Sequence, residues 1–235
     1  MIRGFAILLM FIYHFSWDLT YFRFADFGIF SDPLWIWFAR FIAGLILLVV
    51  GMGQAISFEN SLKNGFRAKT FFKRLVIIAS SAAAVSIGTY LIDPATYVYF
   101  GVLHHITLAT ILLTLALYLP TSSLLILAVA SFAAPQFFTH EIFSAEWLWW
   151  LGLTPVTPAT IDYVPLLPWF GVSLIGAIMA REMRDLPSLT RILAWQPTHA
   201  LGHLVYFAGR HSLVLYMVHQ PILFGGVYLA YSLLT

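Results

Sequence analysis

Three residues near the start of the chain have types and a spacing that suit proton transfer. Arg3 and His14 are 11 residues apart, which at about 100° per residue places both side chains on one face of a helix. Asp18 follows His14 by four residues and stands over the same face, where its carboxylate could accept a hydrogen bond from the imidazole. An Asp-oriented His is typical of a general base. The alternative is a polar network that only holds helices together.

Other polar residues interrupt later apolar segments. His219, Gln220 and Pro221 are consecutive, and the proline frees a backbone carbonyl at a polar position that is typical of a cavity lining. His104 and His105 are adjacent, so they point about 100° apart and at most one can line a given cavity. We treat these residues and Arg40 as reserve catalytic or acceptor-binding candidates, with snorkelling to the outer surface as the alternative for Arg40. We interpret His140, His199 and His203 as solvated loop or interface residues.

The elements that position these residues are predicted to be membrane-spanning helices. Of 235 residues, 61% are hydrophobic and only 9% are charged, so lipid must be the solvent for most of the surface. A mean hydropathy of +0.88 agrees. The first apolar segment carries His14 and Asp18 and no clear cleavage site, and we interpret it as a retained span rather than a signal peptide. The chain has no cysteine, which excludes a thiolate nucleophile or a cysteine-based metal site.

Seven segments are long and apolar enough to cross a bilayer. The sequence therefore predicts an all-α bundle of about seven spans that forms a single domain over 1–235, with a short tryptophan-rich run over 147–153 at the interface. The predicted spans are 4–22, 34–57, 72–92, 99–119, 122–138, 163–181 and 209–233.

The basic loops predict the orientation, because such loops stay in the cytoplasm. One basic loop joins the second and third spans, and the other, with Arg181, Arg184 and Arg191, joins the sixth and seventh. With seven spans, both loops and the N-terminus are cytoplasmic and the C-terminus is outside. The opposite loops are acidic, with Arg23 as their single basic residue. The acidic residues are Asp26, Asp32, Asp93, Glu141, Glu146 and Asp162.

Four stretches resemble bacterial membrane proteins related to lysosomal heparan-alpha-glucosaminide N-acetyltransferase, within a wider transmembrane acyltransferase group that includes acyltransferase family 3. The resemblance spans nearly the whole chain. The stretches are Arg3-Gly4-Phe5-Ala6-Ile7-Leu8-Leu9-Met10 leading to His14, Gly101-Val102-Leu103-His104-His105-Ile106, Pro165-Leu166-Leu167-Pro168-Trp169-Phe170-Gly171, and Gly209-Arg210-His211-Ser212-Leu213 leading to Tyr216 and His219-Gln220-Pro221.

The resemblance implies transfer of an acetyl group from cytoplasmic acetyl-CoA to a sugar on the far side. In acyltransferase family 3 an Arg, ten residues and a His form the hallmark of activity, and Arg3 and His14 reproduce that spacing. The lysosomal enzyme has its catalytic His just after the first span, where this chain instead has Tyr21-Phe22-Arg23-Phe24. We expect His14 to be the catalytic base, with Asp18 as its partner, or to form an acetyl-His intermediate.

A donor with several phosphates needs basic residues on the cytoplasmic side. The residues expected to bind acetyl-CoA are Arg3, Lys63, Arg67, Lys73, Arg74, Arg181 and Arg184. The other expected partners are the lipid bilayer and a glycan acceptor. Neither a metal nor nucleic acid is expected, and a homodimer is an open alternative. The expected location is a bacterial inner membrane.

Two other functions use the same residues. A haem-binding electron carrier would take His14, His104 or His105, and His219 as axial ligands. A proton-coupled transporter would use the His and Asp residues as a relay, although no internal repeat is visible. No phosphate loop, HExxH or GxSxG motif is present, so a soluble type of nucleotide, zinc-protease or hydrolase site has no motif behind it.

Overall fold

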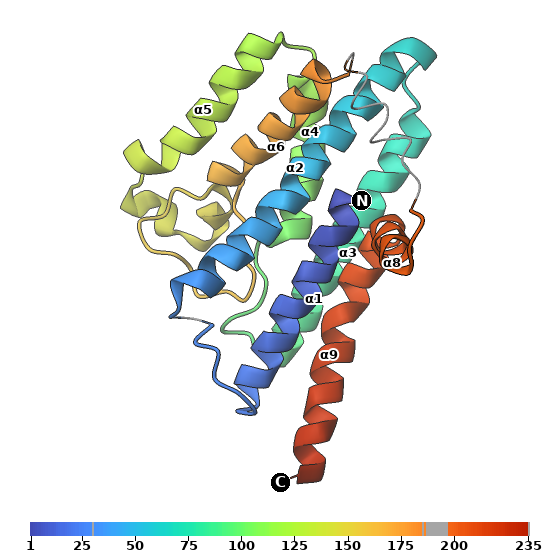
Figure 1. Ribbon diagram of the computed structural model, residues 1–235. Helices are drawn as coiled ribbons and strands as arrows, with labels where there is room; N and C mark the ends of the chain where they lie inside the picture. The colour runs from blue at the N-terminus through green and yellow to red at the C-terminus, as the bar shows by residue number, and fades with distance from the viewer. Residues whose placement is uncertain (30, 185, 187–196, 235) are drawn as a thin grey trace. The chain divides into compact units, whose positions relative to one another are not determined.

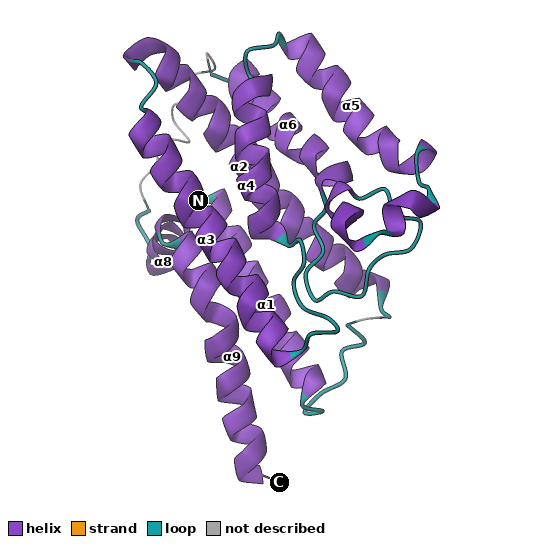
Figure 2. Cartoon of the chain, turned by 180° about the vertical axis from the view of Figure 1, so that it is seen from behind, coloured by secondary structure: helices purple, strands orange, loops and turns teal. Residues whose placement is uncertain are grey.

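The computed structural model describes residues 1–29, 31–184, 186 and 197–234, and this part of the chain is helical without a named strand (Figures 1 and 2). Arg191, one of the predicted cytoplasmic residues, lies outside the described residues. The helices are α1 (Ile2–Tyr21), α2 (Pro33–Asn64), α3 (Ala68–Ile92), α4 (Val102–Ala116), α5 (Thr121–Phe137), α6 (Leu166–Glu182), α8 (Ala200–Arg210) and α9 (Ser212–Leu234), with short 3₁₀ helices η1 (Glu141–Ser144) and η2 (Glu146–Leu151).

The predicted all-α membrane fold is confirmed. Within the described residues, four helices (α1, α2, α3 and α9) are long and apolar enough to cross a membrane, and α4 and α5 are shorter apolar helices. Large apolar side chains lie on the outside, with Leu91 79%, Ile126 68% and Leu233 77% exposed. Such a surface is stable only against lipid, so the chain is a membrane protein.

Each of the seven predicted spans coincides with one main helix, but α4 and α6 are shorter than the predicted segments, whereas α5 has the predicted length. Gly101 precedes α4 in an extended conformation and Pro120 occupies the same position before α5, so the backbone outside these helices is not helical. The first residues after these helices, Leu117 and Tyr118 after α4 and Met183 and Arg184 after α6, form turns rather than further helix. The count of seven crossings therefore remains a prediction.

The chain folds as two compact units. Unit 1 consists of residues 1–46 and 194–235, and unit 2 consists of residues 47–193, so that α2 passes from one unit into the other. Each unit has its own apolar core. In unit 1, Ile7 and Met10 of α1 pack with Ile42 of α2 and Ala208 of α8. In unit 2 the core is formed by small and branched residues of α2, α4, α5 and α6.

In unit 1, α1 and α9 run side by side in the same direction. His14 of α1 lies beside His219 of α9, and Tyr21 further along α1 lies beside Phe224 further along α9. Helix α8 crosses the start of α1 at a steep angle and is seen almost end-on in Figure 1. It approaches so closely at Gly4 that a Cβ atom there would meet the Val205 carbonyl. This crossing fixes the start of α9 beside the start of α1.

In unit 2, α4 and α6 also run in the same direction. His105 at the start of α4 lies beside Pro165 just before α6, and Arg181 at the end of α6 contacts Leu117 just after α4. Helices α3 and α5 run the opposite way, because Ser86 late in α3 contacts His104 early in α4, and Thr121 at the start of α5 contacts Glu182 at the end of α6. Neighbouring helices in sequence therefore alternate in direction within this unit.

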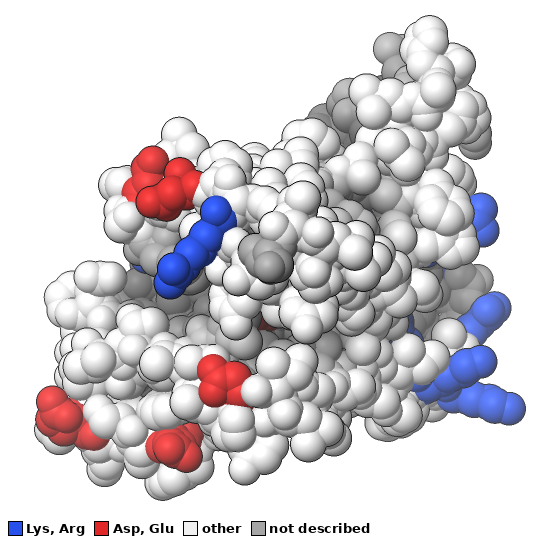
Figure 3. Space-filling view, turned by 90° about the horizontal axis from the view of Figure 1, so that it is seen from below, with Lys and Arg blue, Asp and Glu red and all other residues white. Residues whose placement is uncertain are grey.

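The ends of unit 2 differ in charge. Arg184, after α6, lies 3.5 Å from Glu59 near the end of α2, so Arg184 lies at the same end of unit 2 as the basic residues between α2 and α3. The loops at the other end carry Asp93, Glu141, Glu146 and Asp162. Hydrogen bonds from the Thr96 hydroxyl and the Ala95 N–H hold the pKa of Asp93 below its usual value, so this carboxylate is ionised at neutral pH. Figure 3 shows acidic side chains in a few separate groups on a mostly uncharged face.

Helix α8 was not predicted. The sequence predicts loop or interface positions for His199 and His203, whereas His199 precedes α8 and His203 lies within it. Its apolar residues Leu201, Leu204, Val205 and Ala208 have the spacing of one helical face. That signal is present in the sequence, but a helix of 11 residues is too short to be recognised as a membrane span.

Candidate active site

Two histidines from opposite ends of the sequence meet in unit 1. The ring centroids of His14 in α1 and His219 in α9 are 4.7 Å apart, with the edge of one ring towards the face of the other. His219 is only 4% exposed. Phe11 and Tyr216 pack against the His219 ring at 5.4 and 5.6 Å between centroids. The two imidazoles therefore share one apolar environment between α1 and α9.

The predicted hydrogen bond between Asp18 and His14 is absent. The Asp18 Oδ1 atom instead accepts a hydrogen bond of 2.7 Å from the Gln220 Nε2 atom, and its Oδ2 atom has no hydrogen-bond partner among the described residues. The spacing of four residues does place Asp18 one turn beyond His14, but a side-chain amide of α9 reaches the carboxylate. This correction arises because the sequence does not show which residue of a distant helix lies opposite Asp18.

Three buried acceptor atoms in unit 1 have no donor within the described part of the chain. They are Asp18 Oδ2, Gln220 Oε1 and His219 Nε2. Asp18 is completely buried, and a buried polar atom without a hydrogen bond costs about 1–3 kcal/mol. Because all three atoms come from the His14–His219 and Asp18–Gln220 contacts, this group can receive hydrogen bonds or protons from a bound molecule. We call these four residues the α1/α9 polar cluster.

The other predicted histidines, His104 and His105, belong to unit 2. His104 Nδ1 accepts from the Gly101 N–H at 3.2 Å, and its Nε2 atom lies 3.2 Å from the Ser86 hydroxyl. One ring nitrogen thus caps the start of its own helix α4, and the other joins that end of α4 to α3. His105 is fully buried, its Nδ1 atom lies 3.2 Å from the Pro165 carbonyl, and its Nε2 atom has no hydrogen-bond partner in the described residues. The two rings thus face different neighbours, as adjacent side chains on a helix do.

Arg40 lies on the exposed side of α2 in unit 1, where its guanidinium stacks over the Trp37 ring at 5.1 Å from the centroid. This arrangement is a cation–π contact. Trp37 is itself 65% exposed, so this pair lies on the outside of α2.

The residues predicted to bind acetyl-CoA occupy different environments. Arg3 is exposed at the start of α1. Lys63, at the end of α2, and Arg67, Lys73 and Arg74, at the start of α3, are exposed around one turn of unit 2. These four cations form a compact basic end that can attract phosphates.

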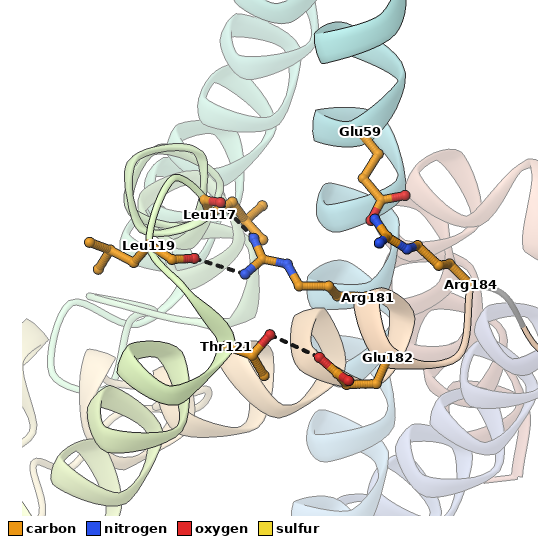
Figure 4. Close-up of polar contacts among 7 residues, drawn as sticks. All are labelled: Glu59, Leu117, Leu119, Thr121, Arg181, Glu182 and Arg184. Carbon is orange, nitrogen blue, oxygen red and sulfur yellow. Dashed lines mark hydrogen bonds and ion pairs between the residues drawn. The ribbon is translucent and has the colours of Figure 1, made fainter.

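Arg181 and Arg184 instead have internal partners (Figure 4). Arg181 donates to the carbonyls of Leu117 and Leu119 at 2.6 and 2.8 Å. These carbonyls follow the end of α4, where helical acceptors lack partners, so Arg181 closes this end of the helix. Arg184 lies 3.5 Å from the Glu59 carboxylate. Both residues therefore have structural roles that the sequence analysis missed, because a basic residue at a helix end gives no sign of its partner.

Asp162 also has a role that the sequence analysis missed. Its Oδ2 atom accepts a hydrogen bond of 3.0 Å from the Val102 N–H in the first turn of α4, although 60 residues separate the two. The sequence identified Asp162 only as an acidic loop residue. An N-terminal cap that comes from a distant loop has no local sequence signal.

The fold and this site define a helical membrane protein in which imidazoles and a carboxylate meet, buried, between two parallel helices. The family model for the catalytic domain of heparan-alpha-glucosaminide N-acetyltransferase matches residues 1–221. The chain therefore belongs to that family, as the sequence resemblance predicted, and is a membrane acetyltransferase of this general kind. Comparisons with curated proteins and with solved structures found no match.

Proposed function

We propose that this protein transfers an acetyl group from cytoplasmic acetyl-CoA to an amine or hydroxyl of a sugar in an envelope or periplasmic glycan. Family membership supports acetyl transfer, and the particular donor and acceptor are part of the proposal. The observation that carries it is the α1/α9 polar cluster, in which three buried acceptor atoms have no donor among the described residues. A sugar amine or hydroxyl supplies such donors.

His14 is the proposed catalytic base. As the acceptor nitrogen or oxygen forms a bond to the acetyl carbonyl carbon, His14 takes the proton that this atom loses. The carbon–sulfur bond then breaks, its electron pair leaves on sulfur, and the thiolate receives a proton to give free CoA. Histidine suits this step because its unperturbed pKa in water is about 6.5.

Asp18 is proposed as a positioning residue that acts through Gln220 rather than through a hydrogen bond to His14. Its carboxylate binds the Gln220 amide, and Gln220 directly follows His219. The contact holds α9 in register with α1, so that the two imidazoles face one another. The remaining oxygens, Asp18 Oδ2 and Gln220 Oε1, are available to the acceptor.

The proposed topology has seven crossings, with the N-terminus in the cytoplasm and the C-terminus outside a bacterial inner membrane. The same direction of α1 and α9 in unit 1 requires an odd number of crossings from the first to the last, and the alternating helices of unit 2 agree with it. The basic end of unit 2 is assigned to the cytoplasm because basic loops stay there.

Acetyl-CoA is proposed to bind on that side. Arg3 is 11 residues from His14 on one helix, a rise of about 16 Å, so a donor with its phosphates near Arg3 can extend its thioester towards His14. The exposed cations Lys63, Arg67, Lys73 and Arg74 are assigned to the donor phosphates, with a smaller contribution from Arg181 and Arg184, whose guanidiniums have protein partners.

Family membership, rather than geometry, favours acetyl transfer over haem binding or proton-coupled transport. In the direct test, purified protein is incubated with radiolabelled acetyl-CoA and fractionated envelope sugars, and label is followed into the sugar fraction. We expect label in a sugar product that depends on His14. If no fraction is labelled, a Soret band would instead support haem binding, and substrate flux in vesicles would support proton-coupled transport.

A further inference from the structure

The His219 ring is held in one tautomer by its own helix. Its Nδ1 atom lies 2.6 Å from the Tyr216 carbonyl oxygen. A carbonyl can only accept, so Nδ1 carries the hydrogen and donates it. In the neutral ring Nε2 then has a lone pair and no hydrogen, which is the state of an imidazole ready to take a proton.

Nothing in the described part of the chain donates to that lone pair. The Nε2 atom is buried and without a hydrogen-bond partner, and native structures rarely leave such an atom unpaired without a role for it. The ionisable groups recorded against the His219 ring are His14 from α1 and Tyr216 from its own helix. Of these, His14 is the one whose ring contacts it directly and can exchange a proton near neutral pH.

The two histidines differ in the hydrogen bonds that their rings make. The structure records no hydrogen bond from a described residue to the His14 ring, so that ring is free to take a proton at one nitrogen and release one at the other. His219 has a fixed donor and a fixed acceptor atom. When Nε2 is protonated, the Nδ1–H bond to Tyr216 becomes charge-assisted and therefore stronger, which stabilises the imidazolium.

We propose that His219 is a second catalytic residue, which stores the proton taken by His14 and delivers it to the leaving thiolate of the donor. This inference rests on the proposed acetyl transfer. His14 removes the proton from the acceptor as the new bond to the acetyl carbon forms, and passes it to His219 Nε2. As the carbon–sulfur bond breaks, the sulfur keeps the electron pair and takes the proton from His219. The acceptor loses one proton, CoA gains it, and both histidines return to their neutral forms.

The decisive variant is His219→Asn. Its side-chain N–H can still donate to the Tyr216 carbonyl, so the local structure is kept, but it cannot take a proton. We expect kcat to fall about 100-fold, as for loss of a general acid–base group, while the KM for acetyl-CoA stays nearly unchanged. The pH dependence of kcat should lose one of its two ionisations. The matched control is His211→Asn, an exposed histidine of the same unit that stacks on Phe207, and it should behave as the wild type.

A second variant separates chemistry from packing. His219→Ala opens space for a small molecule, and added imidazole should restore turnover whereas pyrrole, of the same size but not basic, should not. Near-normal turnover in His219→Asn would overturn the inference. So would joint loss of turnover and acetyl-CoA affinity with equal effects of imidazole and pyrrole, because that result indicates a packing role. The wild type and His14→Ala are measured in parallel. If the wild type transfers no acetyl group, the proposed function itself fails. If the wild type transfers acetyl and His14→Ala does not, the proposed function stands, and the His219 variants then test the role of His219 by itself.

Discussion

The Asp18 carboxylate of α1 accepts a hydrogen bond of 2.7 Å from the Gln220 amide of α9, and 202 residues separate the two in sequence. The contact is fully buried on the Asp18 side. It joins the first and last long helices of the chain at the level of the two histidines. Its strength and its effect on catalysis can be measured independently.

We first predict energetic coupling between Asp18 and Gln220. Alanine at each position and at both should give a double-mutant coupling of about 0.6–1.7 kcal/mol in the free energy of unfolding, the range that such cycles give for hydrogen bonds between membrane helices. Both single changes should also lower acetyl transfer, because the register of α9 against α1 positions His219. Asp18→Asn keeps an acceptor oxygen for Gln220 and should be impaired less than His14→Ala.

The matched control for this pair lies in unit 2, where the Gln54 amide donates to the Thr114 hydroxyl at 2.7 Å. Alanine substitutions there remove a hydrogen bond of the same length and should lower stability without changing turnover per folded molecule. Additive effects of the Asp18 and Gln220 changes would contradict the positioning role.

The second prediction concerns the base. His14→Ala should bind acetyl-CoA with nearly wild-type affinity and transfer the acetyl group at least about 100-fold more slowly. Binding is measured by titration calorimetry and transfer by release of free CoA. A folded variant with near-normal turnover would show that His14 is not the base, and His219, or His105 of unit 2, would be the next candidate.

The third prediction is the topology. The chain contains no cysteine, so single cysteines report on one position each without background. Cysteines at Ser61 and Leu186 should react with a membrane-impermeant reagent only from the cytoplasmic side, whereas one at Glu141 should react only from outside. Labelling of Ser61 and Glu141 from the same side would show that the number of crossings between them is even.

The fourth prediction separates donor-binding cations from structural ones. Replacement of Lys63, Arg67, Lys73 and Arg74 by Gln should weaken acetyl-CoA binding, and the wild-type affinity should itself fall as salt is added. Stability should change little, because these side chains are exposed. Arg181→Gln should have the opposite pattern: it should lower stability and change acetyl-CoA binding little, since its guanidinium binds the carbonyls after α4. Unchanged affinity in the fourfold variant would place the donor phosphates elsewhere.

The fifth prediction is that alanine substitutions at two glycines of α2 change the stability of the protein in opposite directions. A Cβ atom at Gly51 would meet the Ser173 carbonyl of α6, whereas nothing lies within 4 Å of a Cβ at Gly53. Gly51→Ala should therefore destabilise the protein by about 1–3 kcal/mol, as overpacking does. Gly53→Ala should stabilise it by about 0.5–1 kcal/mol, because alanine loses less backbone entropy in a helix. Equal effects at both positions in an unfolding assay would show that α2 and α6 do not approach closely at Gly51.

The sequence by itself determined the class of protein and the residues worth testing. Helical spacing and the bilayer impose strict rules on composition, since each unpaired backbone group in lipid is costly. The long helices therefore follow from apolar segments alone, whereas the short helix α8 does not, and Arg3, His14 and Asp18 fall on one face of the first helix. The four motifs identified the family in the same way, because they preserve residue types in a fixed order.

Tertiary structure decided which residues meet. His219 was only a reserve candidate, and its position against His14 depends on the parallel packing of α1 and α9. The partner of Asp18 was predicted wrongly for the same reason: the intrahelical spacing was correct, but a longer side chain on α9 reached the carboxylate. Arg181 and Asp162 likewise cap α4 from distant segments. Local spacing determines which side chains share a face, whereas contacts between faces depend on how helices pack, and that is a property of the whole chain.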